Sequence, residues 1–566
     1  MIAAAEGIAG LRFTGEEREL MRAAVEARLD AFAKMRGHEL PNSVPPSVAF
    51  RVGPSAAVGA LHTRLSDATT VERPTRDDDL GWLPVRSLAE LVRTRKVTSQ
   101  ELTSLYLDRL RQHDPALECV VTLLDDEAMS DAVQADEEIA AGHYRGPLHG
   151  IPWGAKDLLA TRGHRTTWGA ETFRDQVTDA DATVVTRLRE AGAVLVAKLT
   201  LGALAYGDVW YGGRTRNPWD IEAGSSGSSA GSAAATAAGL VGFAIGSETC
   251  GSIISPATTC GVTGLRPTFG RGSRHGSMAL SWSMDKIGPI CRSVEDCAIV
   301  LAAIHGPDGL DDTVSDAPFA WDADVDVTGL RVGYVADAFE QGHSDDEAWD
   351  RADQTALQHL RSLGVDLRPM DLPEMDVAPL SVILNVEAAA AFDELTRTDA
   401  DDRMVRQTEH AWPNIFRYTR LVPAVEYVQA TRLRTLVMRQ MAETMADLDA
   451  YVAPTFVGKN SLLTNLTGHP AICVPNGRRD NGTPTSVEFI GTLYGEARLL
   501  ALARAYQEND EPPSGSAAAR TVTPRRQPCC RPPCSRDARG PVARHARVAG
   551  GPTAARCPHE TPRAAS

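Results

Sequence analysis

The chain has 566 residues, 43% of them hydrophobic and 23% charged, and a formal net charge of −16. This composition is typical of a globular protein, and the negative charge argues against a general nucleic-acid-binding surface. No apolar run is long enough to span a bilayer, and the N-terminal residues lack the basic segment of a signal peptide. We therefore expect a cytoplasmic protein without membrane association.

The cysteines favour the same location. Six of the ten lie before residue 500, at positions 119, 250, 260, 291, 297 and 473, and none of these six forms a CxxC pair. This scatter predicts reduced thiols rather than a disulfide framework. The CCRPPC run at 529–534 is too cramped for a zinc site, and we expect no metal.

An N-terminal region over 1–84 is predicted to combine helix with a proline-rich wrap. Residues 11–36 carry apolar positions at helical spacing, and Thr14 with Glu17 forms a capping-box pattern. Three prolines are expected to end this helix: Pro41, Pro45 and Pro46.

The next segment, 41–86, is rich in proline and aspartate and should run over the surface. A second helical block is expected over 87–113, with Ser99 as an N-cap.

Strands then alternate with helices. Residues 183–200 predict a helix, a stop at Gly192 and a strand. Further strands are expected at 118–124, 150–159, 330–337, 365–373, 449–455, 470–475 and 486–491, with helices at 346–363 and 495–508 and a mostly helical segment at 385–447. This alternation predicts an α/β domain over 85–510, in which helices sandwich a large mixed β-sheet, with the N-terminal region as a helical extension.

The composition changes after about residue 510. Residues 513–566 contain ten Arg, no Lys and nine Pro, with only Asp537 and Glu560 as acidic residues. Because apolar periodicity is absent, we predict that 511–566 is disordered. A read-through or shifted-frame extension is favoured over a polyanion-binding role.

The stretch from Gly224 to Pro267 concentrates hydroxyls and glycines in two Ser/Gly clusters, at 225–232 and 247–255. The residues between them predict an Ala-rich helix followed by a buried strand. Such clusters are often flexible loops. Closely spaced glycines also let backbone N–H groups converge on one anion, as an oxyanion hole requires, so both interpretations stay open.

A serine hydroxyl is a poor nucleophile until a base takes its proton. The histidine nearest to the Ser/Gly-rich stretch is His275, and no nucleophile elbow of the GxSxG kind stands in a strand–turn–helix context. Lysine is the other documented base, and Lys156 lies inside a predicted buried strand, where burial would lower its pKa. The alternative is a strand-end lysine whose ammonium reaches water.

Eight separated motifs follow one another along residues 85–508: GIPWGAKD (150–157), RLREAGAVLVAKLTLGALA (187–205), NPWD (217–220), SGSSAGSAAATAAG (226–239), GSETCGSI (246–253), CGVTGLRPTFGR (260–271), DKIGPICRSVEDCA (285–298) and NLTGHPAICVP (465–475). Together, and in this order, they resemble the amidase signature family of Ser-Ser-Lys hydrolases. The resemblance implies a large mixed sheet between helices, in agreement with the α/β prediction.

The resemblance also implies roles for particular residues. Lys156 matches the family's catalytic lysine, Ser228 matches the relay serine that follows a cis peptide bond, and Ser252 matches the nucleophile. The oxyanion hole is matched by the backbone N–H groups of Thr249, Cys250, Gly251 and Ser252. The implied reaction is hydrolysis of a carboxylic amide through an acyl-serine intermediate, with no metal or organic cofactor.

Four positions depart from the family's usual residues: Ala230 for Gly, Glu248 for Asp, Cys250 for Gly, and Ile254 for the Arg that often follows GSI. None of these changes removes a catalytic group. Ile254 removes a charge near the site, so the surrounding network must differ. Cys250 places a side chain in the oxyanion loop, either as a small apolar residue or as a reactive thiol.

Three functions remain open at this stage. The extra residues 11–86 favour a stand-alone amidase acting on a small-molecule amide. The second is the family's glutamine-hydrolysing amidotransferase component, which works with partner subunits on a transfer RNA, and only then would nucleic acid be a partner. The third is an inactive family member that serves as a binding protein.

The substrate and the oligomeric state, a homodimer included, also stay open. Aromatic and apolar residues at 412–418 and 425–428 indicate either a partly hydrophobic acyl or aryl pocket or ordinary core packing.

Overall fold

The computed structural model describes residues 2–39, 47, 63–343 and 346–509. The predicted tail over 511–566 and part of the proline-rich wrap lie outside these residues. The domain limits at 84 and 510 therefore stay predictions.

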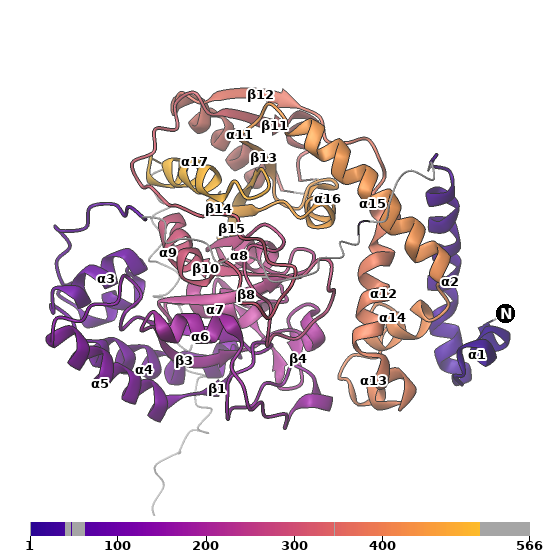
Figure 1. The fold of residues 1–566 in the computed structure, drawn as a ribbon, viewed down its shortest axis with the longest axis horizontal. Coiled ribbons are helices and arrows are strands. Elements are labelled where there is room, and N and C mark those ends of the chain that lie inside the picture. Colours follow the sequence, from indigo (N-terminus) through magenta and orange to yellow (C-terminus); the bar gives the residue numbers. More distant parts are fainter. Residues whose placement is uncertain (1, 40–46, 48–62, 344–345, 510–566) are drawn as a thin grey trace, which may run out of the picture. The chain divides into compact units, whose positions relative to one another are not determined.

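In the described part of the chain, eleven strands form one mixed sheet in the order β1-β3-β2-β8-β10-β9-β14-β15-β13-β11-β12 (Figure 1). The strands are β1 (Val120–Leu123), β2 (Pro152–Lys156), β3 (Val194–Leu199), β8 (Phe243–Glu248), β9 (Thr263–Arg266), β10 (Lys286–Cys291), β11 (Arg331–Val335), β12 (Asp366–Met370), β13 (Ala450–Pro454), β14 (Ala471–Arg478) and β15 (Pro484–Gly491). Strand β2 runs parallel to β3 and β8, and β11 runs parallel to β12 and β13, whereas the strands between these groups pair antiparallel. The predicted α/β class with a large mixed sheet is confirmed.

The α-helices are α1 (Ile2–Ala9), α2 (Gly15–Arg36), α3 (Val85–Arg93), α4 (Ser99–Leu117), α5 (Asp125–Ala140), α6 (Thr183–Glu190), α7 (Ala230–Ala237), α8 (Ile254–Cys260), α9 (Val294–Ile304), α10 (Ala336–Gln341), α11 (Glu347–Ser362), α12 (Val382–Ala391), α13 (Asp393–Arg397), α14 (Trp412–Thr419), α15 (Ala424–Thr444), α16 (Asn460–Thr467) and α17 (Glu496–Asn509). Two short hairpins join β4 (Val209–Trp210) to β5 (Gly213–Arg214) and β6 (Arg216–Asn217) to β7 (Asp220–Gly224). None of the described helices has the length and apolar character needed to cross a membrane.

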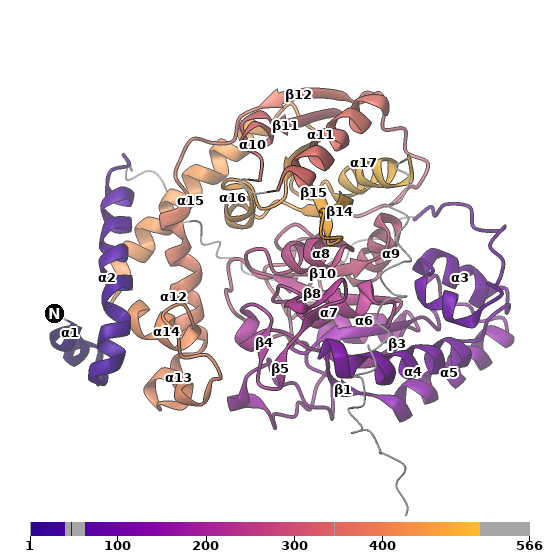
Figure 2. The ribbon, with the colours of Figure 1, turned by 180° about the vertical axis from the view of Figure 1, so that it is seen from behind.

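Alternating side chains of the strands feed two apolar cores, one on each face of the sheet. In β14, Ile472 and Val474 join the first core, whereas Ala471 and Cys473 join the second. Helices α9, α11 and α17 pack into the first core, and α7, α8 and α16 pack into the second. Figure 2 shows α11 and α17 beside the strands β14 and β15 that they contact.

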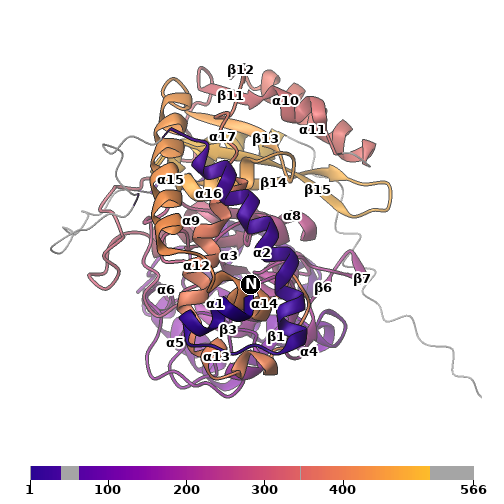
Figure 3. The same ribbon diagram turned by 90° about the vertical axis from the view of Figure 1, so that its right-hand side faces the viewer.

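Helix α2 begins where its sequence predicts. The Thr14 side chain accepts a hydrogen bond from the Glu17 N–H, and the Glu17 carboxylate accepts one from the Thr14 N–H, which is the predicted capping box. The helix ends at Arg36, ahead of the prolines expected to stop it, and the Gly37 N–H donates to the carbonyls of its last turn. Figure 3 shows α2 alongside α14 and α15, which it contacts.

The expected helical block over 87–113 is two helices, α3 and α4, and its predicted N-cap is wrong by one residue. Thr98 caps α4, since its hydroxyl accepts from the Glu101 N–H. The Ser99 hydroxyl instead donates to the carbonyl of Gly150, 2.9 Å away.

Helices α12 to α15 lie in the chain between β12 and β13. Three aromatic residues of this segment are core side chains, whereas Tyr418 and Tyr427 are half-buried. Trp412 stacks on Phe416, which stacks on Phe392, and all three are buried. Core packing, the second of the two interpretations of residues 412–418, therefore holds for Trp412 and Phe416.

Candidate active site

Two neighbouring parallel strands, β2 and β8, bring the predicted site residues together. Lys156 is the last residue of β2, and β8 ends at Glu248, within the second Ser/Gly cluster. Helix α7 begins at Ala230 and packs on β2, which fixes the first Ser/Gly cluster beside Lys156. The predicted helix and strand between the two clusters are thus α7 and β8.

The Lys156 ammonium lies among serine oxygens. Its Nζ donates to the Oγ atoms of Ser228 at 2.8 Å, Ser229 at 2.9 Å and Ser247 at 3.0 Å, and to the Ser247 carbonyl at 3.2 Å. The Lys156 side chain is fully buried. It therefore does not reach water, and the strand-end alternative is wrong.

Burial lowers the pKa of Lys156 to about 7, against the weaker opposing influence of Asp285 and Glu248. Lys156 forms no ion pair with any carboxylate that the structure describes. Lys198, the buried lysine of the neighbouring strand β3, differs because its ammonium lies 3.0 Å from the Asp157 carboxylate. Lys156 can therefore exist as a free amine near neutral pH. Burial also lowers the pKa of Lys286 on β10 to about 7, but its ammonium bonds to Asn465 and not to the serines.

The peptide bond between Gly227 and Ser228 is cis, as the family resemblance implies. Gly227 packs so closely on the backbone of Gly207 that a Cβ at this position would lie 1.9 Å from the Gly207 carbonyl oxygen. Only glycine fits at position 227. This close approach places the first Ser/Gly cluster against the segment after β3.

The second cluster forms a tight loop between β8 and α8. Ser252 is 9% exposed, whereas Ser228 is 1% exposed, so Ser252 is the more accessible of the two hydroxyl residues. Gly251 has φ = +86°, a backbone conformation that glycine adopts without strain. No described residue accepts a hydrogen bond from the backbone N–H groups of residues 249–252. These donors can bind a ligand anion.

Hydrogen bonds between the two clusters hold them together. The Ser229 N–H donates to the Ser252 carbonyl at 3.1 Å, and the hydroxyls of Ser226 and Ser255 lie 2.8 Å apart. Within the described residues, the hydroxyls of Ser228 and Ser252 make no hydrogen bond to each other. Lys156 is thus hydrogen-bonded directly to Ser228, and Ser252 lies in the adjoining loop.

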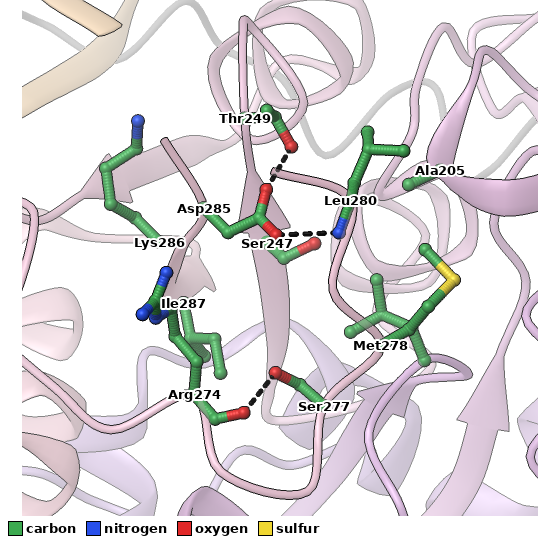
Figure 4. Close-up of a pocket in the computed structure, with 11 residues that line it drawn as sticks. Ala205, Ser247, Thr249, Arg274, Ser277, Met278, Leu280, Asp285, Lys286 and Ile287 are labelled. Atoms are coloured by element: carbon green, nitrogen blue, oxygen red, sulfur yellow. Dashed lines mark hydrogen bonds between the residues drawn. The ribbon is translucent and has the colours of Figure 1, made fainter. Parts of the chain in front are cut away.

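A small cavity of ≈ 10 Å³, room for about one water molecule, lies beside this loop (Figure 4). The Asp285 carboxylate accepts from the Thr249 hydroxyl at 2.6 Å and from the N–H groups of Leu280 and Ser281 at 2.8 and 3.0 Å. Asp285 therefore connects the loop of residues 249–252 to the segment that precedes β10. Its carboxyl is buried, and this burial raises its pKa.

Sequence reasoning missed three of these residues: Ser229, Ser247 and Asp285. Ser229 and Ser247 fall within the two Ser/Gly clusters, and Asp285 opens one of the quoted motifs, so each carried a signal without an assigned role. Their contacts depend on the strand order, which local patterns do not specify.

Among the cysteines that the structure describes, none forms a disulfide or belongs to a metal site. All six described cysteines are free; Cys250 is exposed and the other five are buried. No group of His, Cys, Asp and Glu in the described residues is arranged to hold a metal ion.

The family model described as Amidase matches residues 101–460. The chain belongs to the amidase signature family. It is 33% identical to the A subunit of the glutamyl-tRNA(Gln) amidotransferase from Moorella thermoacetica over 479 residues, which cover 76% of this chain and 98% of that protein. It is 35% identical to a putative amidase AmiD of Mycobacterium bovis over 475 residues, which cover 78% of this chain and 98% of that protein.

Solved structures of this family have the same fold. The native peptide amidase from Stenotrophomonas maltophilia matches with a TM-score of 0.67 and 30% identity, over 75% of this chain and 96% of that chain. Membership of the amidase signature family makes this protein an amidase-type hydrolase of carbon–nitrogen bonds.

Proposed function

We propose that the protein is a stand-alone amidase that hydrolyses a small-molecule carboxylic amide with Lys156 as base, Ser228 as relay and Ser252 as nucleophile. The observation that carries this proposal is the 2.8 Å hydrogen bond from the buried, carboxylate-free Lys156 ammonium to the Ser228 hydroxyl. A lysine with a pKa of about 7 is half neutral near physiological pH, so it can accept a proton there.

The first half-reaction forms an ester. Ser252 Oγ attacks the amide carbonyl carbon, and its proton passes through the Ser228 hydroxyl to neutral Lys156. The carbonyl oxygen becomes an oxyanion that the free N–H groups of residues 249–252 can bind. When the C–N bond breaks, the leaving nitrogen takes the proton back from Lys156 through Ser228, and the amine departs.

The second half-reaction returns the enzyme to its starting state. A water molecule attacks the acyl-Ser252 ester and gives its proton to Lys156 along the same relay. The ester C–O bond then breaks, Ser252 recovers the proton, and the carboxylic acid leaves. This sequence needs the Ser228 and Ser252 hydroxyls to come within hydrogen-bond distance of each other. Catalytic hydrogen bonds of this kind often tighten only when substrate is bound.

The glutamine-hydrolysing amidotransferase component remains the second candidate, because the 33% identity to such a protein extends over 98% of its length. Helix α2 supports the stand-alone enzyme, since it packs on α14 and α15 as part of the fold. The partners expected on this proposal are a small-molecule amide and no nucleic acid.

The test is a panel of aliphatic, aryl and peptide amides, with glutamine included, assayed for released amine or ammonia against Ser252→Ala. We expect turnover by the wild type and none by folded Ser252→Ala. A fluorophosphonate probe should label Ser252 alone. Equal turnover by folded Ser252→Ala would overturn the proposal, and turnover confined to glutamine would favour the amidotransferase component. Failure of both turnover and labelling would leave an inactive family member.

A further inference from the structure

Glu248, the last residue of β8, bridges the two ends of the oxyanion loop. Its Oε2 accepts the N–H groups of Ile253 at 2.8 Å and Ile254 at 3.0 Å, on the far side of residues 249–252. The carboxylate therefore closes the loop into a ring between the strand and the first turn of α8.

The other oxygen of Glu248 is held from two further elements. Oε1 accepts from Arg266 Nη1 on β9 at 2.8 Å and from Asn465 Nδ2 on α16 at 2.9 Å. Lys286 Nζ on β10 donates to the amide oxygen of Asn465 at 2.7 Å, which fixes the orientation of that amide. All four side chains are buried. Every partner of Glu248 is thus a donor on a fixed element of the fold.

The charges of Glu248 and Arg266 also affect the loop. An unneutralised carboxylate beside the loop would oppose the build-up of negative charge on the substrate oxygen. Although burial raises the Glu248 pKa, Arg266 and Lys286 outweigh it and lower the value to about 2, so Glu248 is ionised and paired. Ile254, where the family often has Arg, is buried in the apolar core and brings no charge.

We propose that Glu248 and Arg266 are a positioning pair that aims the N–H groups of residues 249–252 at the substrate oxyanion, with Arg266 supplying from β9 the cation that Ile254 does not provide. This inference rests on the proposed role of Ser252. Neither side chain touches the reacting atoms. Their effect is exerted through the shape and the charge of the oxyanion loop.

Glu248→Gln and Arg266→Met test the pair. In Glu248→Gln, the NH₂ group must face either the two loop amides or Arg266 and Asn465, which are all donors, so the bridge fails on one side. We expect kcat to fall by about 100-fold with little change in KM, as for a misplacement of about 1 Å. The affinity for a trifluoromethyl ketone analogue of the best amide should fall by the same factor. Arg266→Lys, which keeps the charge, should retain more activity than Arg266→Met.

The matched control is Glu496→Gln. Glu496 is also fully buried, accepts the Thr268 N–H at 2.9 Å and pairs with Arg271, away from the oxyanion loop. It should lower the unfolding temperature and leave kcat per folded molecule unchanged. If Glu248→Gln does not fold, Glu248→Asp, which keeps the charge on a shorter side chain, should show the same selective loss of kcat.

Two results would overturn the inference. One is wild-type kcat in folded Glu248→Gln and Arg266→Met, or in Glu248→Asp where it is the variant that folds. The other is an equal loss of kcat in Glu496→Gln. Both are distinct from failure of the proposed function, which shows as activity that does not depend on Ser252 in the otherwise unaltered protein.

Discussion

The ammonium nitrogen of Lys156 lies 2.8 Å from the hydroxyl oxygen of Ser228, although the two residues are 72 positions apart. Strand β2, the third strand from one edge of the sheet, carries the first residue, and the turn before α7 carries the second to meet it. The contact is buried, so its chemistry depends on whether the lysine holds a proton.

The rate of amide hydrolysis should rise with pH and level off above about pH 7. Lys156 must be neutral to accept a proton, and burial lowers its pKa to about 7 against the opposing Asp285 and Glu248. The measurement is kcat/KM across pH 5 to 9. Burial also lowers the pKa of Lys286 to about 7, but its Nζ bonds to Asn465, so the acid limb should persist in the residual activity of Lys286→Met. A flat profile down to pH 5 would contradict a lysine base.

Lys156→Met should abolish amide hydrolysis and stabilise the fold relative to wild type, more at pH 6 than at pH 9.5. Between about pH 7 and pH 10.5 the unfolded wild type binds a proton at Lys156 that the folded protein does not, so wild-type stability rises with pH in that window. Below pH 7 the folded wild type carries the full cost of a buried charge, which methionine removes. The advantage of the variant should shrink by roughly 3 kcal/mol between the two pH values.

Urea unfolding at both pH values measures this effect. Lys198→Met is the matched control, because it removes a buried lysine that pairs with Asp157 and leaves that carboxylate without its cation. It should destabilise the protein by about 3–5 kcal/mol. An advantage of Lys156→Met that does not change with pH would refute the assignment of the low pKa to Lys156.

Ser229→Ala should move the acid limb of the rate profile toward lower pH and reduce kcat modestly. The Ser229 hydroxyl accepts a hydrogen bond from Lys156 Nζ at 2.9 Å and so favours the protonated lysine. It also donates to the Ser247 carbonyl, which orients the groups around the amine. Steady-state kinetics against pH provide the check, with Ser232→Ala as control, since the Ser232 hydroxyl bonds to the Ile245 carbonyl instead. A shift of the limb toward higher pH would contradict this role.

Arg417→Met should destabilise the contact between α2 and α14. The buried Arg417 guanidinium lies 2.9 Å from the carboxylates of Glu17 on α2 and of Asp401 and Asp402. Losing the cation leaves Asp401 buried and unpaired, at a cost of about 3–5 kcal/mol at neutral pH. Burial already raises the Asp401 pKa to about 6, so below that pH the carboxyl takes up a proton and the loss should be smaller.

Thermal unfolding at pH 5 and pH 8 tests this dependence. Arg22→Met, which removes an exposed ion pair with Glu19 on α2, should change the unfolding temperature little at either pH. An equal loss at both pH values in Arg417→Met would show that Asp401 does not titrate there.

Local patterns predicted the elements whose causes are local. The capping box at Thr14, the stop at Gly192 and the unit formed by α7 and β8 each depend on residues a few positions apart. The N-cap of α4 was missed because Thr98 and Ser99 are both competent caps. Which of the two caps the helix depends on Gly150, because its carbonyl accepts a hydrogen bond from the Ser99 hydroxyl.

Contacts within the site lie beyond such patterns. Motif resemblance points to Lys156 and Ser252, but not to the hydrogen bond that Thr249 donates to Asp285 or the one that Arg266 donates to Glu248. Those bonds exist because β8, β10 and β9 are neighbours in the sheet, and strand order is a property of the whole chain. The role of the aromatic residues of α14 was ambiguous for the same reason, because protein cores and pocket walls are built from the same residue types.

Helices α12 to α15 lie between β12 and β13 in the chain, so changes in these helices can be considered apart from changes at the site. The three proposed catalytic residues, Lys156, Ser228 and Ser252, all precede residue 260, so the segment from α12 to α15 can change in sequence or length without altering their order in the chain. Helix α2 packs on this segment through α14 and α15, and hence we expect the N-terminal region and the segment to vary together. Recombination that joins the N-terminal helix of one homologue to the α12–α15 segment of another should therefore fail more often than exchange of the two as a unit.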